Sequence, residues 1–262
     1  GKTTTLRCVA GILQPNAGLI QIAGHDLMRK PEDAKRCLSF VPEVPNPYDM
    51  LTVMEHLRFV AAAFGAEESL SDAENLLKRL DLWEKRNALG AALSKGMKQK
   101  LGIIAALMLD APVLILDEPS SGLDPLMQKI FIELILEEKK REKTIFMSSH
   151  HFPEIERTCE RVGMIRDGEL LAIQDITLLK QKERQTFDIE VSGEEDAELL
   201  RQSGLTLYPL DHHKFTIQVT GEQELLWKTL AQIRVRRFQQ GSLELEEAFM
   251  HYYHSSLRGD NT

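Results

Sequence analysis

Two hydrophobic periods alternate along the chain up to about residue 180. Short apolar runs are typical of buried strands, and segments with one apolar face at helical spacing are typical of amphipathic helices. The predicted strands are 19–24, 38–41, 113–116, 144–147, 162–166 and 169–173. The predicted helices are 3–13, 32–37, 52–64, 71–80, 97–109, 125–140 and 152–160. Strands that alternate with helices predict an α/β domain with a largely parallel sheet and ligands at the carboxyl ends of its strands.

Residues 53–110 hold only predicted helices. This stretch indicates a helical subdomain inserted into the sheet domain. Thr52, with Glu55 three residues later, fits a capping box at the start of one of these helices.

The pattern changes after about residue 180. The order strand, helix, strand, strand, helix, strand predicts a small α+β appendage of ferredoxin-like type. Its predicted elements are strands at 187–191, 205–210, 215–219 and 234–239, and helices at 194–202, 222–233 and 242–253. We therefore expect two domains, 1–180 and 181–262.

Composition narrows the functional classes. Hydrophobic and charged contents of 43% and 27% are ordinary for a globular protein, and the net charge of −8 argues against a general binder of nucleic-acid phosphates. No run approaches the roughly 18 apolar residues that span a bilayer. A transport role would thus need a separate membrane subunit. The 3 cysteines are odd in number and widely spaced, which indicates neither a disulfide framework nor a metal cluster.

Four short motifs carry the chemistry. The chain starts with Gly1-Lys2-Thr3-Thr4, the end of a phosphate-binding pattern. Leu93-Ser94-Lys95-Gly96-Met97 opens a predicted helix. The apolar strand 113–116 then ends in Asp117-Glu118, and a Ser-Gly-Leu-Asp turn follows at 121–124. In this order the motifs resemble the nucleotide-binding domain of ABC transporters, and the resemblance covers nearly the whole chain.

The resemblance implies a P-loop NTPase fold that binds ATP and Mg²⁺. Gly1 and Lys2 would contact the phosphates, and the Thr3 hydroxyl would ligate Mg²⁺. Thr4 would lie beside the phosphates at a helix N-terminus, where backbone donors favour anions. The tripeptide Gly-Lys-Thr alone is a weak signal, because it also occurs at plain helix starts.

Two acids and a histidine are identified with the family's hydrolytic residues. Asp117 resembles the acid that holds Mg²⁺, and Glu118 the general base that activates water. The alternative is a pair of solvated acids at a strand end. His150, after the strand 144–147, resembles the switch histidine that contacts the γ-phosphate. The adjacent His151 is the alternative, and the register from the strand favours His150.

The loop at 94–96 departs from the family's Leu-Ser-Gly-Gly-Gln signature. Ser94 could cap the helix, and Gly96 allows a close backbone approach to phosphate. Lys95 adds positive charge, while Met97 cannot replace the hydrogen bonds of a glutamine, although Gln99 lies nearby. In the family this loop binds the nucleotide held by the opposite subunit. Ser-Lys-Gly-Met loops resemble those of multidrug, antibiotic and polysaccharide exporters. A plain capped helix is the alternative.

Glu43 stands where the family usually has a glutamine that touches Mg²⁺ or water. A carboxylate can still ligate the metal, so we expect altered metal dependence. The proline-rich stretch 42–47 would lead to the membrane partner, or its prolines only form an ordinary turn between two elements. Asp124 would lie at the dimer interface, and it would also fit the turn before a helix.

The phosphate-binding pattern G-x-x-x-x-G-K-[ST] is only half present, because the sequence begins at its last glycine. We expect a sequence truncated within this loop, and weak ATP binding and impaired hydrolysis by residues 1–262 alone.

The resulting expectation is the ATP-hydrolysing subunit of an ABC transporter. A homo- or heterodimer of such domains would close on ATP and drive transport, in the export direction, through an integral membrane permease at the cytoplasmic face. The alternatives are an ABC-type ATPase that acts on ribosomes or nucleic acid, and an inactive remnant. No nucleic-acid partner is expected.

Overall fold

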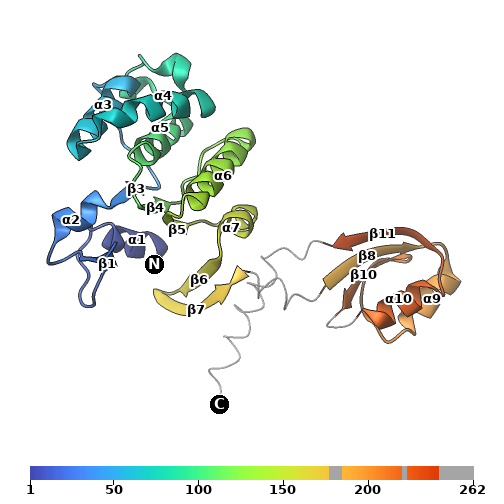
Figure 1. Ribbon diagram of the computed structural model, residues 1–262. Coiled ribbons are helices and arrows are strands. Elements are labelled where there is room, and N and C mark those ends of the chain that lie inside the picture. The colour runs from blue at the N-terminus through green and yellow to red at the C-terminus, as the bar shows by residue number, and fades with distance from the viewer. Residues whose placement is uncertain (177–184, 220–222, 242–262) are drawn as a thin grey trace. The chain divides into compact units, whose positions relative to one another are not determined.

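The computed structural model describes residues 1–176, 185–219 and 223–241, and the chain divides into two compact units (Figure 1). The first consists of Gly1–Cys159 with Gly163–Ala172, and the second of Glu160–Val162 with Ile173–Thr262. No helix in the described ranges has the length and apolar character required to cross a bilayer.

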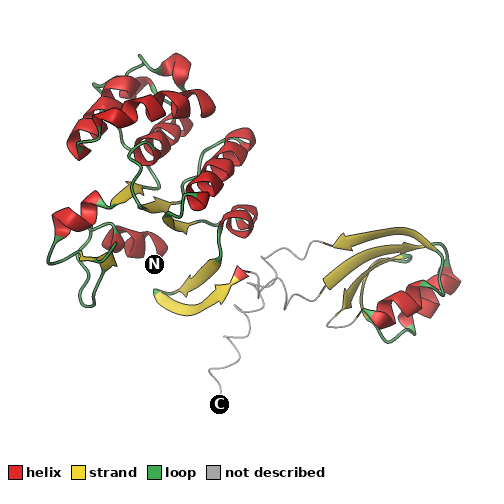
Figure 2. Ribbon diagram, in the orientation of Figure 1, coloured by secondary structure: helices red, strands yellow, loops and turns green. Residues whose placement is uncertain are grey.

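The centre of the first unit is a parallel sheet of β3 (Leu38–Val41), β4 (Val113–Asp117) and β5 (Thr144–Ser148), in that order (Figure 2). β4 is the middle strand and is almost fully buried, which explains its continuous apolar sequence. Asp117 pairs in register with Ser148, so the carboxyl ends of β4 and β5 meet at one edge. The α/β prediction is confirmed.

Helices and one small hairpin surround this sheet. The helices are α1 (Lys2–Val9), α2 (Pro31–Arg36), α6 (Pro125–Lys140) and α7 (Phe152–Thr158). The hairpin consists of β1 (Gln21–Ile22) and β2 (His25–Asp26). A further two-stranded sheet is formed by β6 (Arg161–Arg166) and β7 (Glu169–Asp175).

Two predicted elements near the start are wrong in extent. The strand expected at 19–24 is shorter, Gln21–Ile22, and is the first strand of a hairpin, because Ala23 and Gly24 take φ values of 48° and 84° and form a two-residue turn before His25–Asp26. The helix expected at 3–13 ends at Val9, shortly before Gly11 at φ 68°. Leu13, in the part of the predicted range that is not helical, is 42% exposed.

Three helices form the inserted subdomain and lie together in Figure 1: α3 (Val53–Phe64), α4 (Leu70–Arg79) and α5 (Lys95–Leu107). Short 3-10 helices connect them at Glu67–Ser69, Trp83–Lys85 and Gly90–Ala92. The capping box predicted at Thr52 is confirmed. Its hydroxyl accepts from the Glu55 backbone at 3.2 Å, and its own backbone N–H donates to the Glu55 carboxylate at 2.8 Å.

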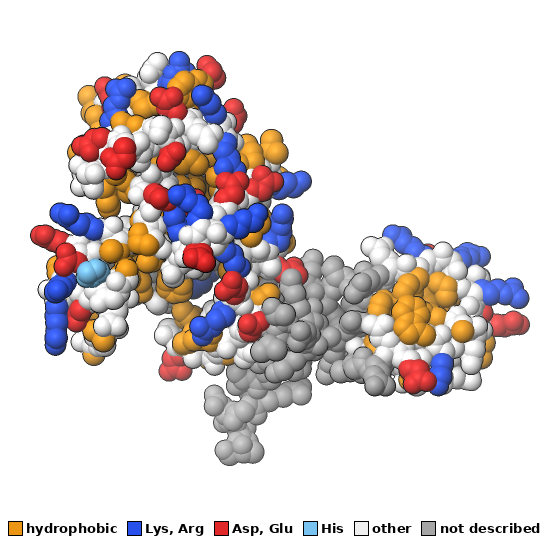
Figure 3. Space-filling model, in the orientation of Figure 1, with side chains coloured by type: hydrophobic (Ala, Val, Ile, Leu, Met, Phe, Trp, Pro, Cys, Tyr) orange, Lys and Arg blue, Asp and Glu red, His pale blue; other side chains and the backbone are white. Residues whose placement is uncertain are grey.

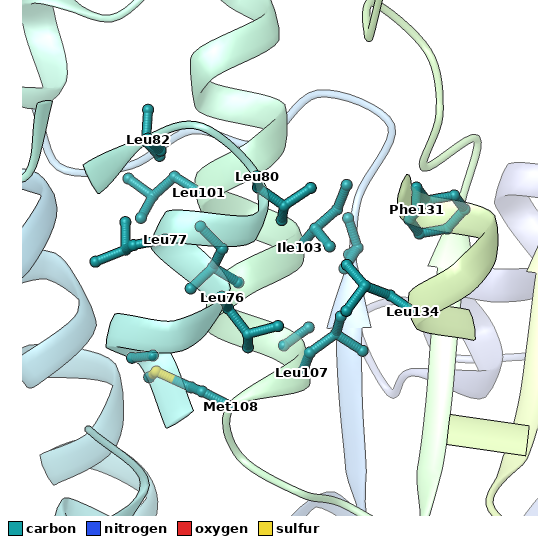
Figure 4. Close-up of a cluster of buried hydrophobic side chains, with 14 of the residues drawn as sticks. Leu76, Leu77, Leu80, Leu82, Leu101, Ile103, Leu107, Met108, Phe131 and Leu134 are labelled. Atoms are coloured by element: carbon teal, nitrogen blue, oxygen red, sulfur yellow. The ribbon is translucent and has the colours of Figure 1, made fainter. Parts of the chain in front are cut away.

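The core joins this helical subdomain to α6. Figure 4 shows side chains of α4 and α5 directed toward one another, with Phe131 and Leu134 of α6 beside them. Fully burying each leucine or phenylalanine contributes about 1.5–3 kcal/mol. Arg79 adds a bidentate ion pair with Glu137 of α6, at 2.6 and 2.7 Å. The helical subdomain is thus fastened to the helix that follows the Asp124 turn.

The second unit is a four-stranded antiparallel sheet in the order β11-β8-β10-β9 with two helices. Its elements are β8 (Gln185–Val191), α9 (Glu194–Arg201), β9 (Thr206–Asp211), β10 (Lys214–Val219), α10 (Glu224–Leu230) and β11 (Val235–Gly241). This topology is ferredoxin-like. Alternate residues such as Ile189 and Ile217 are buried, which is why the strands alternate in sequence. The helix predicted at 242–253 lies outside the described residues.

Candidate functional site

The carboxyl edge of the parallel sheet receives the N-terminus of α1. Lys2 Nζ lies 2.8 Å from Glu118 Oε1, and the Thr3 hydroxyl donates to Asp117 Oδ1 at 3.2 Å. These residues are more than one hundred positions apart in sequence. The sheet therefore brings together two motifs that the sequence presents separately.

Asp117 ends β4 and is fully buried. Its Oδ1 accepts hydrogen bonds from the hydroxyls of Thr3 and Ser148, the latter at 2.7 Å. Its Oδ2 is buried and has no hydrogen-bond partner among the described residues. A buried carboxylate oxygen without a donor is costly unless another group meets it. Together with the Thr3 hydroxyl, it is the oxygen donor set that a hard divalent cation prefers.

Glu118 has an unusual backbone and two cationic neighbours. Its φ of 47° lies in the left-handed region, which non-glycine residues adopt mainly where the surroundings enforce it. The enforcing contacts run from its backbone N–H to the carbonyl and hydroxyl of Ser148, at 3.1 and 3.0 Å. The side chain is only 12% exposed and points between Lys2 and His150.

Charge and burial act on Glu118 in opposite directions. Burial alone raises the pKa of this carboxyl, but hydrogen bonds and charge from Lys2 and His150 outweigh it and hold the pKa below its ordinary value. His150 Nδ1 lies 2.6 Å from Oε2, and its backbone N–H donates to the same oxygen at 3.3 Å. Because an ionised carboxylate only accepts, Nδ1 carries the proton of this bond.

The two adjacent histidines differ in their surroundings. The His150 side chain is 76% exposed apart from its contact with Glu118. Nδ1 of His151 is instead buried without a hydrogen-bond partner in the described part of the chain. It is His150 that lies against Glu118.

The residues Ser94, Lys95 and Gly96 form a second group at the start of α5. The Ser94 hydroxyl accepts from the Met97 backbone N–H at 3.3 Å, which confirms the predicted cap. Gly96 lies so close to the turn before α6 that an added Cβ would be 2.8 Å from the Gly122 carbonyl oxygen. The Lys95 methylenes lie next to Gly122. Within the described residues, this group makes no hydrogen bond or ion pair with Lys2 or Glu118.

In the described part of the chain, no side-chain bond joins Lys2 or Glu118 to the other predicted site residues Asp124, Glu43 and Thr4. Asp124 caps α6, accepting from the backbone N–H groups of Leu126 and Met127 at 3.1 and 3.0 Å. Glu43 is exposed two residues beyond the end of β3, on the edge where β4 ends. Thr4 is exposed in the first turn of α1.

Sequence reasoning missed three residues that hold the site. Ser148 bonds both Asp117 and the Glu118 backbone. Gln99 is fully buried and donates to the Pro119 carbonyl at 3.0 Å, which ties α5 to the loop after β4. Glu154, on α7, is also fully buried. A polar residue on a predicted helix gives no sign of burial until its distant partners are known.

The visible surface carries mixed charges. On the first unit, positive and negative side chains are interspersed, with no continuous basic stripe on the face shown (Figure 3). On the second unit, apolar atoms gather on the same view, and the exposed rings of Trp227 and Phe238 lie 6.0 Å apart.

Comparisons with known proteins identify the family. Residues 1–121 match the ABC transporter family. The bacitracin transport ATP-binding protein BcrA of Bacillus licheniformis is 34% identical over 215 residues, which are 82% of this chain and 70% of BcrA. The chain belongs to the ABC transporter family of ATP-binding proteins.

Solved structures agree with this assignment. The ATP-binding subunit of an ABC transporter is 34% identical and superposes with a TM-score of 0.64, covering 69% of this chain and 76% of that one. A dimeric ATP-binding cassette in a post-hydrolysis state, bound to ADP and Pi, is 21% identical with a TM-score of 0.61, covering 67% and 81%. This ABC protein is an ATP-binding transporter subunit with an ATPase domain of the P-loop fold.

Proposed function

We propose that two copies of this ABC ATPase, or one copy and a related subunit, hydrolyse ATP at their interface and drive export through a separate membrane permease at the cytoplasmic face. The observation that carries the hydrolytic part is the convergence of Lys2, Thr3, Asp117, Glu118 and His150 at one sheet edge. BcrA, whose name states bacitracin transport, supports the transport part.

Each group of residues supplies only part of what a nucleotide site needs, which is why we propose a site shared between subunits. The Lys2–Glu118 group offers a cation, a base and metal ligands from one chain. The Ser94–Gly96 group offers the N-terminus of a helix of 13 residues, where backbone donors and the helix dipole favour an anion. We assign both groups to one nucleotide, held between opposite subunits, because neither contacts the other within the described chain.

Thr3 and Asp117 are the residues that would hold Mg²⁺, with Glu43 as a third oxygen ligand from the end of β3. The orphaned Asp117 Oδ2 fits this role. Ser148 leaves that oxygen free by bonding Oδ1 instead. When bound, Mg²⁺ supplies positive charge to the phosphoryl oxygens.

Glu118 would act as the base. It accepts a proton from the attacking water while the bond between the β- and γ-phosphates breaks and ADP leaves. Its surroundings suit a carboxylate that must be ionised before turnover. Lys2 and His150 occupy both of its oxygens, so they orient the side chain and also compete with water for it.

Lys2 gives the site a built-in change on nucleotide binding. A triphosphate competes with Glu118 for the ammonium of Lys2. Once Lys2 moves to phosphate, Glu118 loses one of the partners that lower its pKa. The carboxylate then becomes a stronger base at the moment the substrate is present.

The permease would dock on the groove beside the proline-rich stretch. This groove of about 240 Å³ lies between that stretch and α3 and α5. Gly102 of α5 allows Pro45 to pack closely against the helix, because an added Cβ would be 2.8 Å from the Pro45 ring. His56 lines the groove, and the ring of Tyr48, which is 57% exposed, lies beside it, 6.0 Å from the His56 ring between centroids. Phe59 packs edge-on against Tyr48 at 5.2 Å. Exposed aromatic rings at a groove suit an apolar partner segment.

Glu118→Gln in the full-length protein tests the hydrolytic proposal. The amide keeps the size of the side chain but cannot take the proton, so turnover is expected to fall by about 10²–10⁴-fold while ATP binding is retained. Steady-state hydrolysis and nucleotide titration measure the two effects, and sedimentation should show an ATP-dependent dimer. Glu84→Gln, at an exposed position, is the matched control.

Undiminished turnover in Glu118→Gln would remove Glu118 as the base. The transport part is tested separately by isolating the protein from its own cells. We expect it with an integral membrane permease, and recovery with ribosomes would favour the other class of ABC ATPase.

A further inference from the structure

A buried acid lies behind the proposed catalytic residues. Glu154 is on α7, four residues after His150, and is fully buried. The proposed reaction does not use it, since among the described residues it bonds to neither Lys2 nor Asp117. Burying a carboxyl is unfavourable unless its oxygens are hydrogen-bonded, so its contacts indicate what it does.

One oxygen of Glu154 accepts two hydroxyl bonds from two different loops. Ser120 donates to Oε2 at 3.0 Å, and Ser149 donates to the same atom. Ser120 is two residues after Glu118, in the loop that follows β4. Ser149 immediately precedes His150, in the loop that follows β5. The carboxyl therefore bridges the two loops that carry the base and the histidine.

Both serines also hold the backbone of their loops. The Ser149 hydroxyl accepts from the His151 backbone N–H at 3.0 Å while it donates to Glu154. The Ser120 carbonyl accepts from the Leu123 N–H at 3.2 Å in the turn toward α6. A displacement of Ser149 is thus transmitted to the backbone of His151, next to His150, and a displacement of Ser120 moves the chain two residues from Glu118 directly.

The contact that this bridge would protect is short. His150 Nδ1 and Glu118 Oε2 are 2.6 Å apart, and the His150 ring is otherwise mostly exposed. Little packing holds the ring in place, so its position depends on the loop backbone. A misplacement of about 1 Å in a catalytic group can reduce the rate by about 10²-fold.

We propose that Glu154 is a positioning residue that sets the relative placement of Glu118 and His150 by accepting the Ser120 and Ser149 hydroxyls together. This inference rests on the proposed role of Glu118 as the base. The required property is an acceptor oxygen shared by two donors. If Glu154 only filled space in the core, its role would not depend on the hydrogen bonds from Ser120 and Ser149.

The amide variant separates these possibilities. Glu154→Gln keeps a carbonyl oxygen that can accept both hydroxyls, whereas Glu154→Ala removes the acceptor. The amide nitrogen would replace Oε1, which has no partner among the described residues, so it breaks no existing bond. Glu156→Ala removes the same side chain from an exposed position on the same helix and is the matched control.

The experiment measures ATP hydrolysis, ATP binding and thermal unfolding of the full-length protein and its variants. We expect Glu154→Ala to lower kcat by about 10²-fold and to leave the ATP Kd within a factor of about two, because the defect is in geometry and not in ground-state binding. Glu154→Gln should recover most of kcat. Ser120→Ala with Ser149→Ala should lower kcat as much as Glu154→Ala, and adding Glu154→Ala to that pair should change little, since all three act through one bridge.

Several outcomes overturn the inference. A kcat of Glu154→Ala equal to that of Glu156→Ala would do so, and so would a defect that Glu154→Gln fails to relieve. If Glu154→Ala does not fold, the serine pair and Glu154→Gln decide the question, and a normal kcat in the serine pair is then sufficient against it. The Glu118→Gln variant, measured alongside, keeps the two proposals apart: its full activity refutes the proposed base, while its inactivity with a fully active Glu154→Ala refutes only the bridge.

Discussion

The two groups of predicted nucleotide-contacting residues are built in opposite ways. The Lys2–Glu118 group consists of polar and charged side chains from α1, from the end of β4 and from the loops after β4 and β5. Its bonds join residues 116, 114 and 32 positions apart in sequence. The Ser94–Gly96 group is a local structure, a capped helix start packed against the Gly122 carbonyl. The first group can rearrange when a charged ligand competes for its ion pairs. The second is fixed by backbone contact and can only move as a body.

Gly96→Ala gives the largest expected effect on this comparison. The new Cβ would lie 2.8 Å from a backbone oxygen, so the loop or the turn before α6 must shift. We expect hydrolysis to fall by about 10²-fold, with ATP binding to the Lys2 side retained, as measured by turnover and nucleotide titration.

Gly193→Ala is the matched control for this variant, because its φ of −166° is extended and nothing lies within 4 Å of an added Cβ. Normal turnover in Gly96→Ala would mean that the Ser94–Gly96 group is not held rigidly against Gly122.

The titration of Glu118 tests the charged group. Its folded-state pKa lies below the ordinary 4.5, so this carboxyl stabilises the fold above that value and loses its contribution as the pH falls through the lower, folded-state pKa. His150→Ala removes one of the partners that lower the pKa and should move it upward. Carboxyl carbon shifts followed by NMR, without nucleotide, measure it.

His151→Ala is the control for the titration, because the His151 ring is not among the groups that shift Glu118. If both histidine variants shift the Glu118 pKa equally, the 2.6 Å contact between His150 Nδ1 and Glu118 Oε2 is not what lowers that pKa.

Thr52→Ala should have the smallest effect on function. The capping box of α3 is lost, and the free energy of unfolding should fall by about 1 kcal/mol. Turnover should be unchanged, because Thr52 belongs to the helical subdomain but not to the Ser94–Gly96 group. Chemical denaturation and hydrolysis rates measure the two quantities, and Thr52→Ser, which keeps the hydroxyl, is the control. A loss of turnover would show that this group senses the whole subdomain.

The two groups also differ in how far they follow from sequence. The cap at Ser94 and the capping box at Thr52 are predictable because their donors and acceptors lie within three residues. The apolar strand before Asp117 likewise predicts a buried strand that delivers an acid to a sheet edge. The resemblance to a family then supplies the roles of Lys2, Glu118 and His150, which no local pattern states.

Other features could not be predicted, for identifiable reasons. Ala23 gives no sign of a left-handed backbone, so the turn of the small hairpin falls inside the predicted strand 19–24. Ser148 and Glu154 are common residues that each bond to a residue more than thirty positions away, Asp117 and Ser120 respectively, and only the assembled sheet reveals these partners.

The left-handed backbone at Glu118 has a consequence for laboratory evolution. A glycine would adopt a φ of 47° without strain, which offsets part of the stability that is lost with the carboxylate's bonds to Lys2 and His150. Glu118→Gly should therefore lose little resistance to heat while it lacks a base, and selecting a library of this ATPase for thermal endurance alone would not remove such dead enzymes. Any such campaign has to screen for turnover in the same round.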